Sequence, residues 1–394
     1  MKMEKESLGI HSEYACHDVY GALNMPVYHT LAYEFKDAKS MSDAFCGRTD
    51  VPDYSRITNP TVINFERIVR SLTGSRDVIA FNSGMAAISN AVMALAQSGK
   101  KIVTSRHLFG NTFLLFTDVL RRFGVGTEFC DLTDITALKE SIDADTCCIF
   151  LEIMTNPQME VADIRAIADV AHAVNIPVIA DTTMIPFTHF NAASLGIDVE
   201  VVSSTKYFAG GGTSLGGLVI DYGTIEGFDN RMRREMLMNL GAYMNPHAAY
   251  MQTLGIETIY ARYGSQQRNA TAVAEALSSI PGITVNYPGL ATNRYHDICV
   301  RQFNGNFGAM ITFELPSEES CFKFIDSLKM IHRATNLFDN RSLAIHPAST
   351  IFGTLSQKQR DEMDISPTLI RLSIGLEHTS DIINDLYQAI KAAI

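Results

Sequence analysis

The chain has 394 residues, of which 46% are hydrophobic and 19% are charged, so it is long enough to bury a large core and to form two packed domains. Its net charge of -11 at pH 7 argues against a basic surface of the kind that binds nucleic acid or an anionic membrane. No run of about 18 or more apolar residues is present, and the first residues, MKMEKESLGIHSEY, lack the apolar stretch of a signal peptide.

The cysteines give a second constraint. They lie at positions 16, 46, 130, 147, 148, 299 and 321 and form neither a CxxC pair nor the regular spacing of a disulfide framework. This favours a reducing compartment, so we expect a cytoplasmic protein. No metal site is expected.

Residues 1–58 are predicted to form an arm. The segment contains glycine, proline and scattered aromatic residues, but no convincing core pattern. We therefore expect the first packed domain to begin near residue 59.

Residues 59–250 are predicted to form an α/β domain. Short runs rich in Val and Ile alternate with longer amphipathic stretches, which is typical of a buried, mostly parallel sheet with helical crossovers. Such a sheet places ligand groups at the carboxyl ends of its strands. Helical spacing of apolar residues occurs at 85–97, 111–124 and 163–174. The expected strands are DVIAF (77–81), KIVTS (101–105), TEFCDL (127–132), CCIFLEI (147–153), IPVIADTT (176–183), VEVVSS (199–204) and GGLVIDY (216–222).

Residues 251–394 are predicted to form a smaller α+β domain. The segment begins with a long helical stretch and ends with an amphipathic helix from Ser380. Between them, AMITFEL (309–315) and LIRLSIGL (369–376) are expected to be strands.

Lys206 is the first candidate for a catalytic side chain. It follows the strand VEVVSS almost directly and precedes the glycine-rich AGGGTSLGG. A lysine at the end of a buried strand loses hydration, which lowers its pKa and makes the neutral amine available to a carbonyl group. The glycines allow the backbone to approach a flat ligand closely. By itself, the segment is equally compatible with a surface lysine at a glycine turn.

Asp181 ends the preceding strand, IPVIADTT. A carboxylate there can pair with a protonated pyridine nitrogen and keep the ring an effective electron sink. A helix cap or a solvated strand end is the commoner role of a lone aspartate, but the nearby candidate lysine favours the cofactor.

The turn from Asn82 to Met85 connects the strand DVIAF to a helix. Exposed N–H groups at a helix amino terminus, reached through Gly84, can bind a phosphate. Simple helix capping by Ser83 explains the same residues.

Two arginines also indicate anion binding. Arg371 lies in the otherwise apolar strand LIRLSIGL, where its charge needs an anionic partner, such as a substrate carboxylate or a structural acid. Arg56 lies in the arm, in YSRITNPT.

Together and in this order, these segments resemble the cysteine and methionine metabolism family of fold-type I pyridoxal-phosphate enzymes, over essentially the whole chain. The family includes cystathionine γ-synthase, cystathionine lyases, methionine γ-lyase and the acylhomoserine sulfhydrylases. The resemblance implies the aspartate aminotransferase-like fold, with a mostly parallel seven-stranded sheet in the large domain and a smaller α+β carboxyl-terminal domain. It also implies pyridoxal 5'-phosphate bound to Lys206 as a Schiff base.

The family's motifs imply further site residues. Asp181 corresponds to the acid on the pyridine nitrogen, Phe109 to the residue stacked on the ring, and Arg371, with Ser342 beside it, to the group that binds the substrate carboxylate. The remaining implied cofactor contacts are Ser83, Gly84, Met85, Asn156, Thr183, Ser203 and Thr205.

The arm motif YSRITNPT matches the family's Y-S-R-x-x-N-P-T. In the family, its tyrosine and arginine reach the phosphate bound by a neighbouring subunit. The resemblance therefore implies that Tyr54 and Arg56 complete a partner's site, that Tyr54 also acts on the substrate, and that the chain forms a homo-oligomer, a tetramer built as a dimer of dimers.

Three positions depart from the family's pattern. Phe109 in LFGNT replaces the usual tyrosine and can stack, but it cannot give or take a proton. Gly211 replaces the usual histidine after the lysine, and HPAST continues as Ile351-Phe352 instead of the frequent Thr-His. These changes bear on the shape of the substrate pocket.

Phe109, in place of the family's usual tyrosine, favours some of the family's reactions over others. A thiol, with a pKa near about 8.5, leaves more easily with a positioned acid, whereas a carboxylate, near about 4, needs little help. An O-acetyl- or O-succinyl-L-homoserine sulfhydrylase, which makes homocysteine from sulfide by γ-replacement, is therefore favoured over cystathionine γ-synthase and over methionine γ-lyase or a cystathionine lyase. Lys206, or a water held by Tyr54, can still supply a proton, so these alternatives stay open.

Two hypotheses that assign the protein to another functional class are weaker. A protein that binds the cofactor but has lost turnover has little use for Lys206, Asp181 and Arg371 together. A nucleotide-binding domain is not favoured, because neither GxGxxG nor GxxxxGK[ST] occurs in a strand-turn-helix context.

Overall fold

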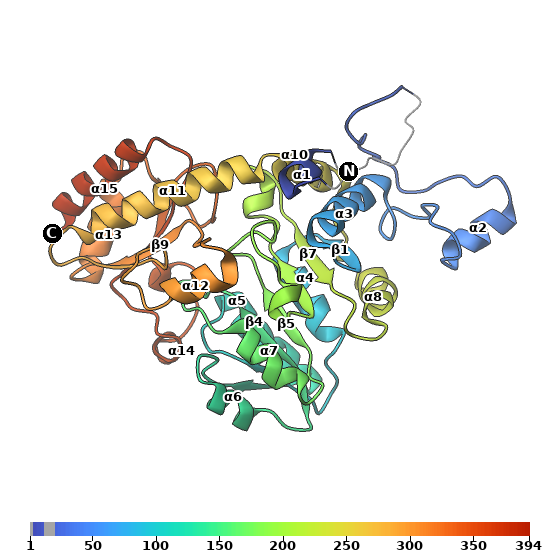
Figure 1. The fold of residues 1–394 in the computed structure, drawn as a ribbon, viewed down its shortest axis with the longest axis horizontal. Coiled ribbons are helices and arrows are strands. Elements are labelled where there is room, and N and C mark those ends of the chain that lie inside the picture. Colours follow the sequence, from blue (N-terminus) through green and yellow to red (C-terminus); the bar gives the residue numbers. More distant parts are fainter. Residues whose placement is uncertain (1–2, 12–19) are drawn as a thin grey trace.

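The computed structural model describes residues 3–11 and 20–394. Two sheets organise the described chain, a large one in its first half and a smaller one towards its carboxyl end (Figure 1). None of the helices in these two described ranges is long and apolar enough to span a membrane.

The large sheet has seven strands in the order β1-β7-β6-β5-β4-β2-β3. Strand β7 runs antiparallel to both its neighbours, and the other pairs are parallel. The predicted mostly parallel sheet is confirmed, although β3 ends earlier than expected. The strands are β1 (Asp77–Phe81), β2 (Lys101–Thr104), β3 (Gly126–Phe129), β4 (Thr146–Glu152), β5 (Val178–Asp181), β6 (Val199–Val202) and β7 (Gly217–Asp221).

Helices cover this sheet, and local capping explains where several of them begin. Asn59 caps α3 with its side chain, Pro60 occupies the first turn, and Gly74 ends the helix in the left-handed conformation (φ 68°). The predicted helix at 111–124 is continuous, but its hydrogen-bond spacing changes from α to π to 3₁₀. The segments are α3 (Pro60–Thr73), α4 (Gly84–Met93), α5 (Gly110–Leu114), η1 (Leu115–Val119), η2 (Leu120–Phe123), α6 (Ile135–Ser141), α7 (Ile164–His172), η3 (Ala193–Leu195), η4 (Tyr207–Ala209), α8 (Phe228–Asn230), η5 (Arg231–Leu237), α9 (Met238–Leu240) and α10 (Pro246–Glu257).

The smaller sheet has five strands in the order β10-β11-β12-β9-β8. The predicted boundary at residue 250 falls inside α10, and the long helix α11 leads to this sheet (Figure 1). The elements are α11 (Ile259–Ser278), β8 (Thr284–Asn286), α12 (His296–Phe303), β9 (Met310–Glu314), α13 (Glu318–Ser327), β10 (His332–Arg333), β11 (Leu343–Ile345), η6 (Pro347–Ser349), α14 (Gln357–Glu362), β12 (Leu369–Ser373) and α15 (Thr379–Ala393).

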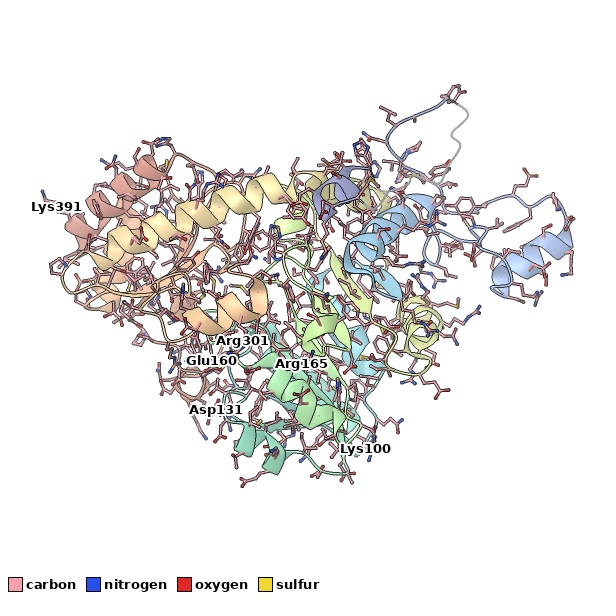
Figure 2. The ribbon with its side chains drawn as sticks, in the orientation of Figure 1. Lys100, Asp131, Glu160, Arg165, Arg301 and Lys391 are labelled. Carbon is pink, nitrogen blue, oxygen red and sulfur yellow. The ribbon has the colours of Figure 1, made fainter. Side chains whose placement is uncertain are left out.

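The two sheet regions are joined by polar contacts as well as by a shared apolar core. Arg301 of α12, labelled in Figure 2, donates to the Asp163 carboxylate at the amino end of α7 over 2.6 Å. This contact is an exposed ion pair between the two regions.

The first 58 residues, which the sequence predicts to be an arm, contain two different parts. Helix α1 (Lys5–Ile10) lies against α3 and α10 of its own chain, so it belongs to the packed body. Residues 20–58 extend away from both sheets, with α2 (Ala38–Phe45) at the far end (Figure 1). Large apolar side chains on this extension are exposed: Leu23, Leu31, Met41, Phe45 and Val51.

Candidate active site

A cavity of about 330 Å³ lies at the carboxyl ends of β1, β4, β5 and β6, and segments of the small region close it. This is the position that an open parallel sheet offers to a ligand. The residues predicted from the sequence that line it are Ser83, Gly84, Met85, Phe109, Asn156, Asp181, Thr183, Ser203, Thr205, Lys206 and Arg371.

One end of the cavity is formed by the amino terminus of α4. The Ser83 hydroxyl accepts the Ala86 N–H at 3.2 Å, which starts the helix. A Cβ atom at Gly84 would lie 2.6 Å from the Ser203 Cβ, so only glycine lets the helix end approach the end of β6. Free N–H groups, the helix dipole and the Ser203 and Thr205 side chains then meet in one place, which suits a phosphate.

Lys206 enters the cavity from the turn after β6. Its Nζ donates to Asn336 Oδ1 over 3.1 Å, and the neighbouring Tyr207 is fully buried and stacked on Phe338. Burial, helped by the positive charge of Arg371 and opposed by Asp181, lowers the pKa of Lys206 to about 8. A larger share of the amine is therefore neutral near neutral pH than in an ordinary lysine, and the neutral amine is the form that attacks a carbonyl group.

Asp181 and Glu152 form a pair of carboxyl groups at adjacent strand ends. They stand opposite each other in the register of β4 and β5, and both line the cavity. Burial raises the pKa of both, and the charge of Asp181 raises that of Glu152 further. Asp181 accepts the Thr183 N–H at 2.9 Å and Glu152 accepts the Phe109 N–H at 2.6 Å. Burial and the neighbouring charge therefore favour the protonated form of Glu152 more than that of Asp181, whose carboxylate is stabilised by Thr183 and by the charge of Lys206.

Arg371 is 2% exposed and lies across the cavity on β12. It donates to two neutral oxygens, Asn156 Oδ1 and the Thr335 carbonyl, each at 3.2 Å. Its Nε is buried without a hydrogen-bond partner in the described part of the chain. Burial lowers its pKa to about 9, so the guanidinium lacks the anion that would stabilise its charge. A substrate carboxylate is the anion that fits.

Three predicted residues do not reach this cavity. Ser342 does not line it: its hydroxyl donates to Glu377 and accepts the Gly375 N–H, and its role beside Arg371 stays a prediction. Tyr54 and Arg56 lie in the extended arm, and Arg56 is bonded to the Met238 carbonyl.

Sequence reasoning missed two residues at the site, Glu152 and Asn336. Glu152 could have been found, because it ends the predicted strand CCIFLEI next to the strand that ends at Asp181. Asn336 precedes β11 in an irregular segment and carries no sequence signal. The triglycine turn that follows Lys206 explains the departure at Gly211: its φ is +129°, and a Cβ there would lie 2.8 Å from Asn340 Nδ2.

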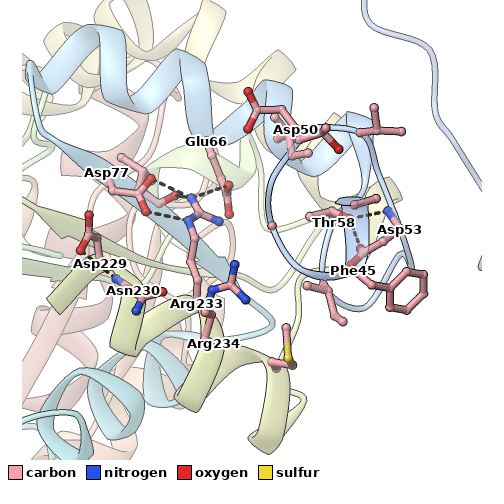
Figure 3. A pocket seen from close by; sticks show the side chains of 18 of the residues that line it. Phe45, Asp50, Asp53, Thr58, Glu66, Asp77, Asp229, Asn230, Arg233 and Arg234 are labelled. Carbon is pink, nitrogen blue, oxygen red and sulfur yellow. Dashed lines mark hydrogen bonds and ion pairs between the residues drawn. The ribbon is translucent and has the colours of Figure 1, made fainter. Parts of the chain in front are cut away.

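A larger cavity, of about 500 Å³, lies between the arm, α3 and η5. Figure 3 shows one of its arginines, Arg233, directed at two carboxylates. The guanidinium is 2.6 Å from Asp77 and 3.1 Å from Glu66. Although burial opposes the charge of Arg233, these acids outweigh it and raise its pKa. This arginine is fully paired within the chain and does not require a ligand.

The family described as Cys/Met metabolism PLP-dependent enzyme matches residues 6–391. The chain belongs to this family. The resemblance predicted from the sequence is confirmed, and the protein is an enzyme of the pyridoxal-phosphate-dependent sulfhydrylase and lyase group.

Relatives of known name align with nearly the full length of this chain. It is 34% identical to an O-succinylhomoserine sulfhydrylase of Pseudomonas aeruginosa over 93% of this chain and 90% of the relative, and 33% identical to an L-methionine gamma-lyase of Fusobacterium nucleatum over 99% and 100%. The crystal structure of a Campylobacter jejuni protein described as O-acetylhomoserine (thiol)-lyase superimposes with a TM-score of 0.94 at 33% identity, covering 99% of this chain and 100% of that one.

The cofactor of this family member is pyridoxal phosphate. The Campylobacter jejuni structure carries it as N'-pyridoxyl-lysine-5'-monophosphate, a covalent conjugate of the cofactor with a lysine. The residues here fit the same group, since a lysine of lowered pKa, the Asp181 carboxyl group and a helix amino terminus surround one cavity.

Proposed function

We propose that the chain is an O-acyl-L-homoserine sulfhydrylase that makes L-homocysteine from sulfide by γ-replacement. The observation that carries the proposal is Phe109, which lines the cavity with Lys206 and has no proton to give. A carboxylate leaves without an acid, whereas a thiolate leaves poorly without one. The sulfhydrylase relatives support this choice.

We propose the following roles for the chain's own residues. Bound pyridoxal phosphate supplies an electron-withdrawing ring that acidifies the C–H bonds of the attached amino acid. Lys206 holds the cofactor and, once released, moves protons at the substrate Cα through its Nζ. The Asp181 carboxylate accepts a hydrogen bond from the protonated ring nitrogen.

The remaining side chains hold the two ligands in place. Arg371 binds the substrate carboxylate, and Asn156, whose Oδ1 accepts from Arg371 over 3.2 Å, orients that guanidinium. Ser83, Gly84, Met85, Ser203 and Thr205 surround the phosphate, Phe109 covers the ring, and Thr183, whose hydroxyl accepts the Ser203 N–H at 2.8 Å, joins the ends of β5 and β6.

The product distinguishes the candidate reactions. The cofactor-loaded enzyme is given O-acetyl-L-homoserine with sulfide and, in separate reactions, L-methionine or L-cystathionine alone. We expect homocysteine from the first mixture and little keto acid from the other two. Keto acid and ammonia formed rapidly from methionine would establish a γ-lyase instead and would show that Phe109 does not prevent thiolate departure.

The γ-lyase is the second candidate, because one full-length relative carries that name and because the Lys206 amine can itself donate a proton. The Phe109→Tyr variant adds the missing acid, and Phe109→Leu is its control without a hydroxyl. We expect Tyr, but not Leu, to raise keto acid formation from methionine by about 100-fold, the low end of what a positioned acid contributes. Equal behaviour of both variants would contradict the leaving-group argument.

We also propose that Tyr54 and Arg56 complete the site of a partner subunit, in a tetramer built as a dimer of dimers. The exposed apolar side chains of the arm support this, as does the position of both residues outside the cavity of their own chain. Co-expression of Arg56→Ala and Lys206→Ala chains tests it. Mixed oligomers should regain activity that neither variant has alone, because one type of shared site receives both native residues. A cytoplasmic setting is part of the proposal, and the described cysteines, all free thiols, fit it.

A further inference from the structure

The cavity contains few charges for its size, and their identities restrict what can bind. Among the described residues that line it, the cations are Lys206 and Arg371, and the acids are Glu152 and Asp181. Under the proposed function, Lys206 holds the cofactor and Arg371 takes the α-carboxylate of the amino acid. No lining cation of the described chain is then left for a second carboxylate.

The rest of the wall is largely apolar. Ile351 adjoins the turn that carries Phe109, since its carbonyl lies 3.2 Å from where a Gly110 Cβ would be. Leu337 is buried, while Leu215 is 67% exposed and lies at the mouth. The departure from the family pattern at Ile351 thus adds an apolar side chain to the cavity.

Nearby cations outside the lining are held elsewhere. Arg341 is bonded to Asp339 at 2.9 Å and to the Gly211 carbonyl at 3.0 Å, on the outer side of the triglycine turn. Arg56, which the proposed oligomer brings from a partner, is assigned to the phosphate. A carboxylate at the far end of a bound amino acid would therefore meet no unpaired lysine or arginine from the described residues that line the cavity, and its partial desolvation would be unfavourable.

We propose that this cavity selects uncharged groups at the γ-carbon. It takes O-acetyl-L-homoserine in preference to O-succinyl-L-homoserine, and hydrogen sulfide or a small apolar thiol such as methanethiol in preference to cysteine. In the reaction, the Cγ–O bond breaks and acetate leaves with the bonding pair, while sulfur forms the Cγ–S bond and the thiol proton is released to solvent. The inference rests on the proposed function and names its substrate class.

The first test compares kcat/KM of the cofactor-loaded enzyme for the two acyl donors with sulfide. We expect at least about 30-fold preference for the acetyl ester, the discrimination that loss of one charge-assisted hydrogen bond produces. With the acetyl ester, methanethiol should give methionine, and cysteine should give little cystathionine. Equal use of both esters would overturn the inference and leave the sulfhydrylase assignment intact.

A matched pair of variants tests the missing cation directly. Ile351→Arg places a guanidinium on the partly exposed wall, and Ile351→Met changes its shape without charge. The Arg variant should shift the ratio of kcat/KM towards the succinyl ester by at least about tenfold, and the Met variant should not. A shift of the same size in both variants would show that shape, not charge, decides the preference.

A binding measurement keeps the inference testable if neither ester is turned over. L-norleucine and L-2-aminoadipate differ mainly in a terminal methyl or carboxylate, and neither has a γ-leaving group. Their dissociation constants follow from the change in cofactor absorbance on titration of the loaded enzyme. We expect norleucine to bind at least about tenfold more tightly. Tighter binding of 2-aminoadipate would contradict the preference for an uncharged terminal group, whatever reaction the enzyme catalyses.

Discussion

Each of the two cavities contains a buried or partly buried arginine, but one arginine is paired with acids and the other is not. The larger, of about 500 Å³, surrounds Arg233, whose guanidinium is paired with Asp77 and Glu66. The smaller, of about 330 Å³, contains Arg371, which donates to two neutral oxygens and keeps a buried Nε without a partner in the described chain. If the larger volume were the criterion, the first cavity would be taken as the functional site. The unpaired guanidinium of Arg371 indicates the second cavity instead.

This difference separates structural charge from functional charge. Glu66 also accepts the Ala80 N–H at 2.8 Å, so the Arg233 network fixes α3, β1 and η5 to one another. Arg371 and Lys206 instead have their pKa values lowered by burial, and in the roles proposed for them bound ligands supply the missing partners. Substitutions in the first network should therefore affect stability, and those in the second should affect chemistry.

Lys206→Ala should have the largest effect. Without the amine, the cofactor has no covalent attachment and the substrate Cα has no base. We expect turnover to fall by at least about 10⁴-fold and the visible absorbance of the purified protein to be lost on dialysis. Lys100→Ala, at an exposed lysine paired with Asp145, is the control and should keep both. Retained yellow colour in the Lys206 variant after dialysis would disprove the assignment of the cofactor lysine.

Arg371→Lys and Arg233→Lys test the comparison directly, because each keeps the charge and removes the planar fork. For Arg371→Lys we expect KM for the acyl-homoserine to rise by roughly 10–100-fold, with little change in melting temperature. For Arg233→Lys, in which the side chain is 36% exposed, we expect a loss of about 1–3 kcal/mol of stability and an unchanged KM. The same outcome for both variants would remove the distinction between the two cavities.

Sequence reasoning located the large-sheet wall of the site well, for a definable reason. The carboxyl ends of parallel strands meet at one edge, so Asp181 and Lys206, each at or just after a predicted strand end, had to lie close together. The same rule also predicts that Glu152, at the end of the neighbouring strand, lies there, although the sequence analysis did not name it.

The wall formed by the small region was harder to predict. Arg371 stood out because an arginine in an apolar strand needs an anion, but Ser342 and Asn336 both come from a segment without clear periodicity. Which of them contacts Lys206 depends on packing: Ser342 is hydrogen-bonded to Glu377, and Asn336 accepts from Lys206. Tyr54, which we propose to complete a partner's site, lies outside the cavity of its own chain.

Asn336→Ala tests the contact that the sequence did not indicate. Asn336 Oδ1 accepts from Lys206 Nζ over 3.1 Å in the state with a free lysine, so it stabilises the ammonium form and positions it. We expect kcat to fall by roughly 3–10-fold with KM nearly constant, and the lower limb of the kcat pH profile to move to lower pH because the lysine pKa falls. A drop in kcat without a shift of the profile would mean that Asn336 has only a structural role.

Substitution of His107 should give the smallest effect. This residue resembles Arg233 and not Arg371, because its charge is already paired within the chain, between the two sheet regions. Its ring lies 3.2 Å from Glu160 and 2.9 Å from Asp364. Burial lowers its pKa, but these two acids outweigh burial and raise it above the usual 6.5. A raised pKa in the folded state means that the stabilisation is fully present below about pH 6.5 and is lost as pH rises through the folded value. The difference in melting temperature between the loaded wild-type enzyme and His107→Gln should therefore be about 1–2 °C at pH 6 and vanish by pH 9. An equal difference at both values would mean that the ring acts by packing and that its charge contributes nothing.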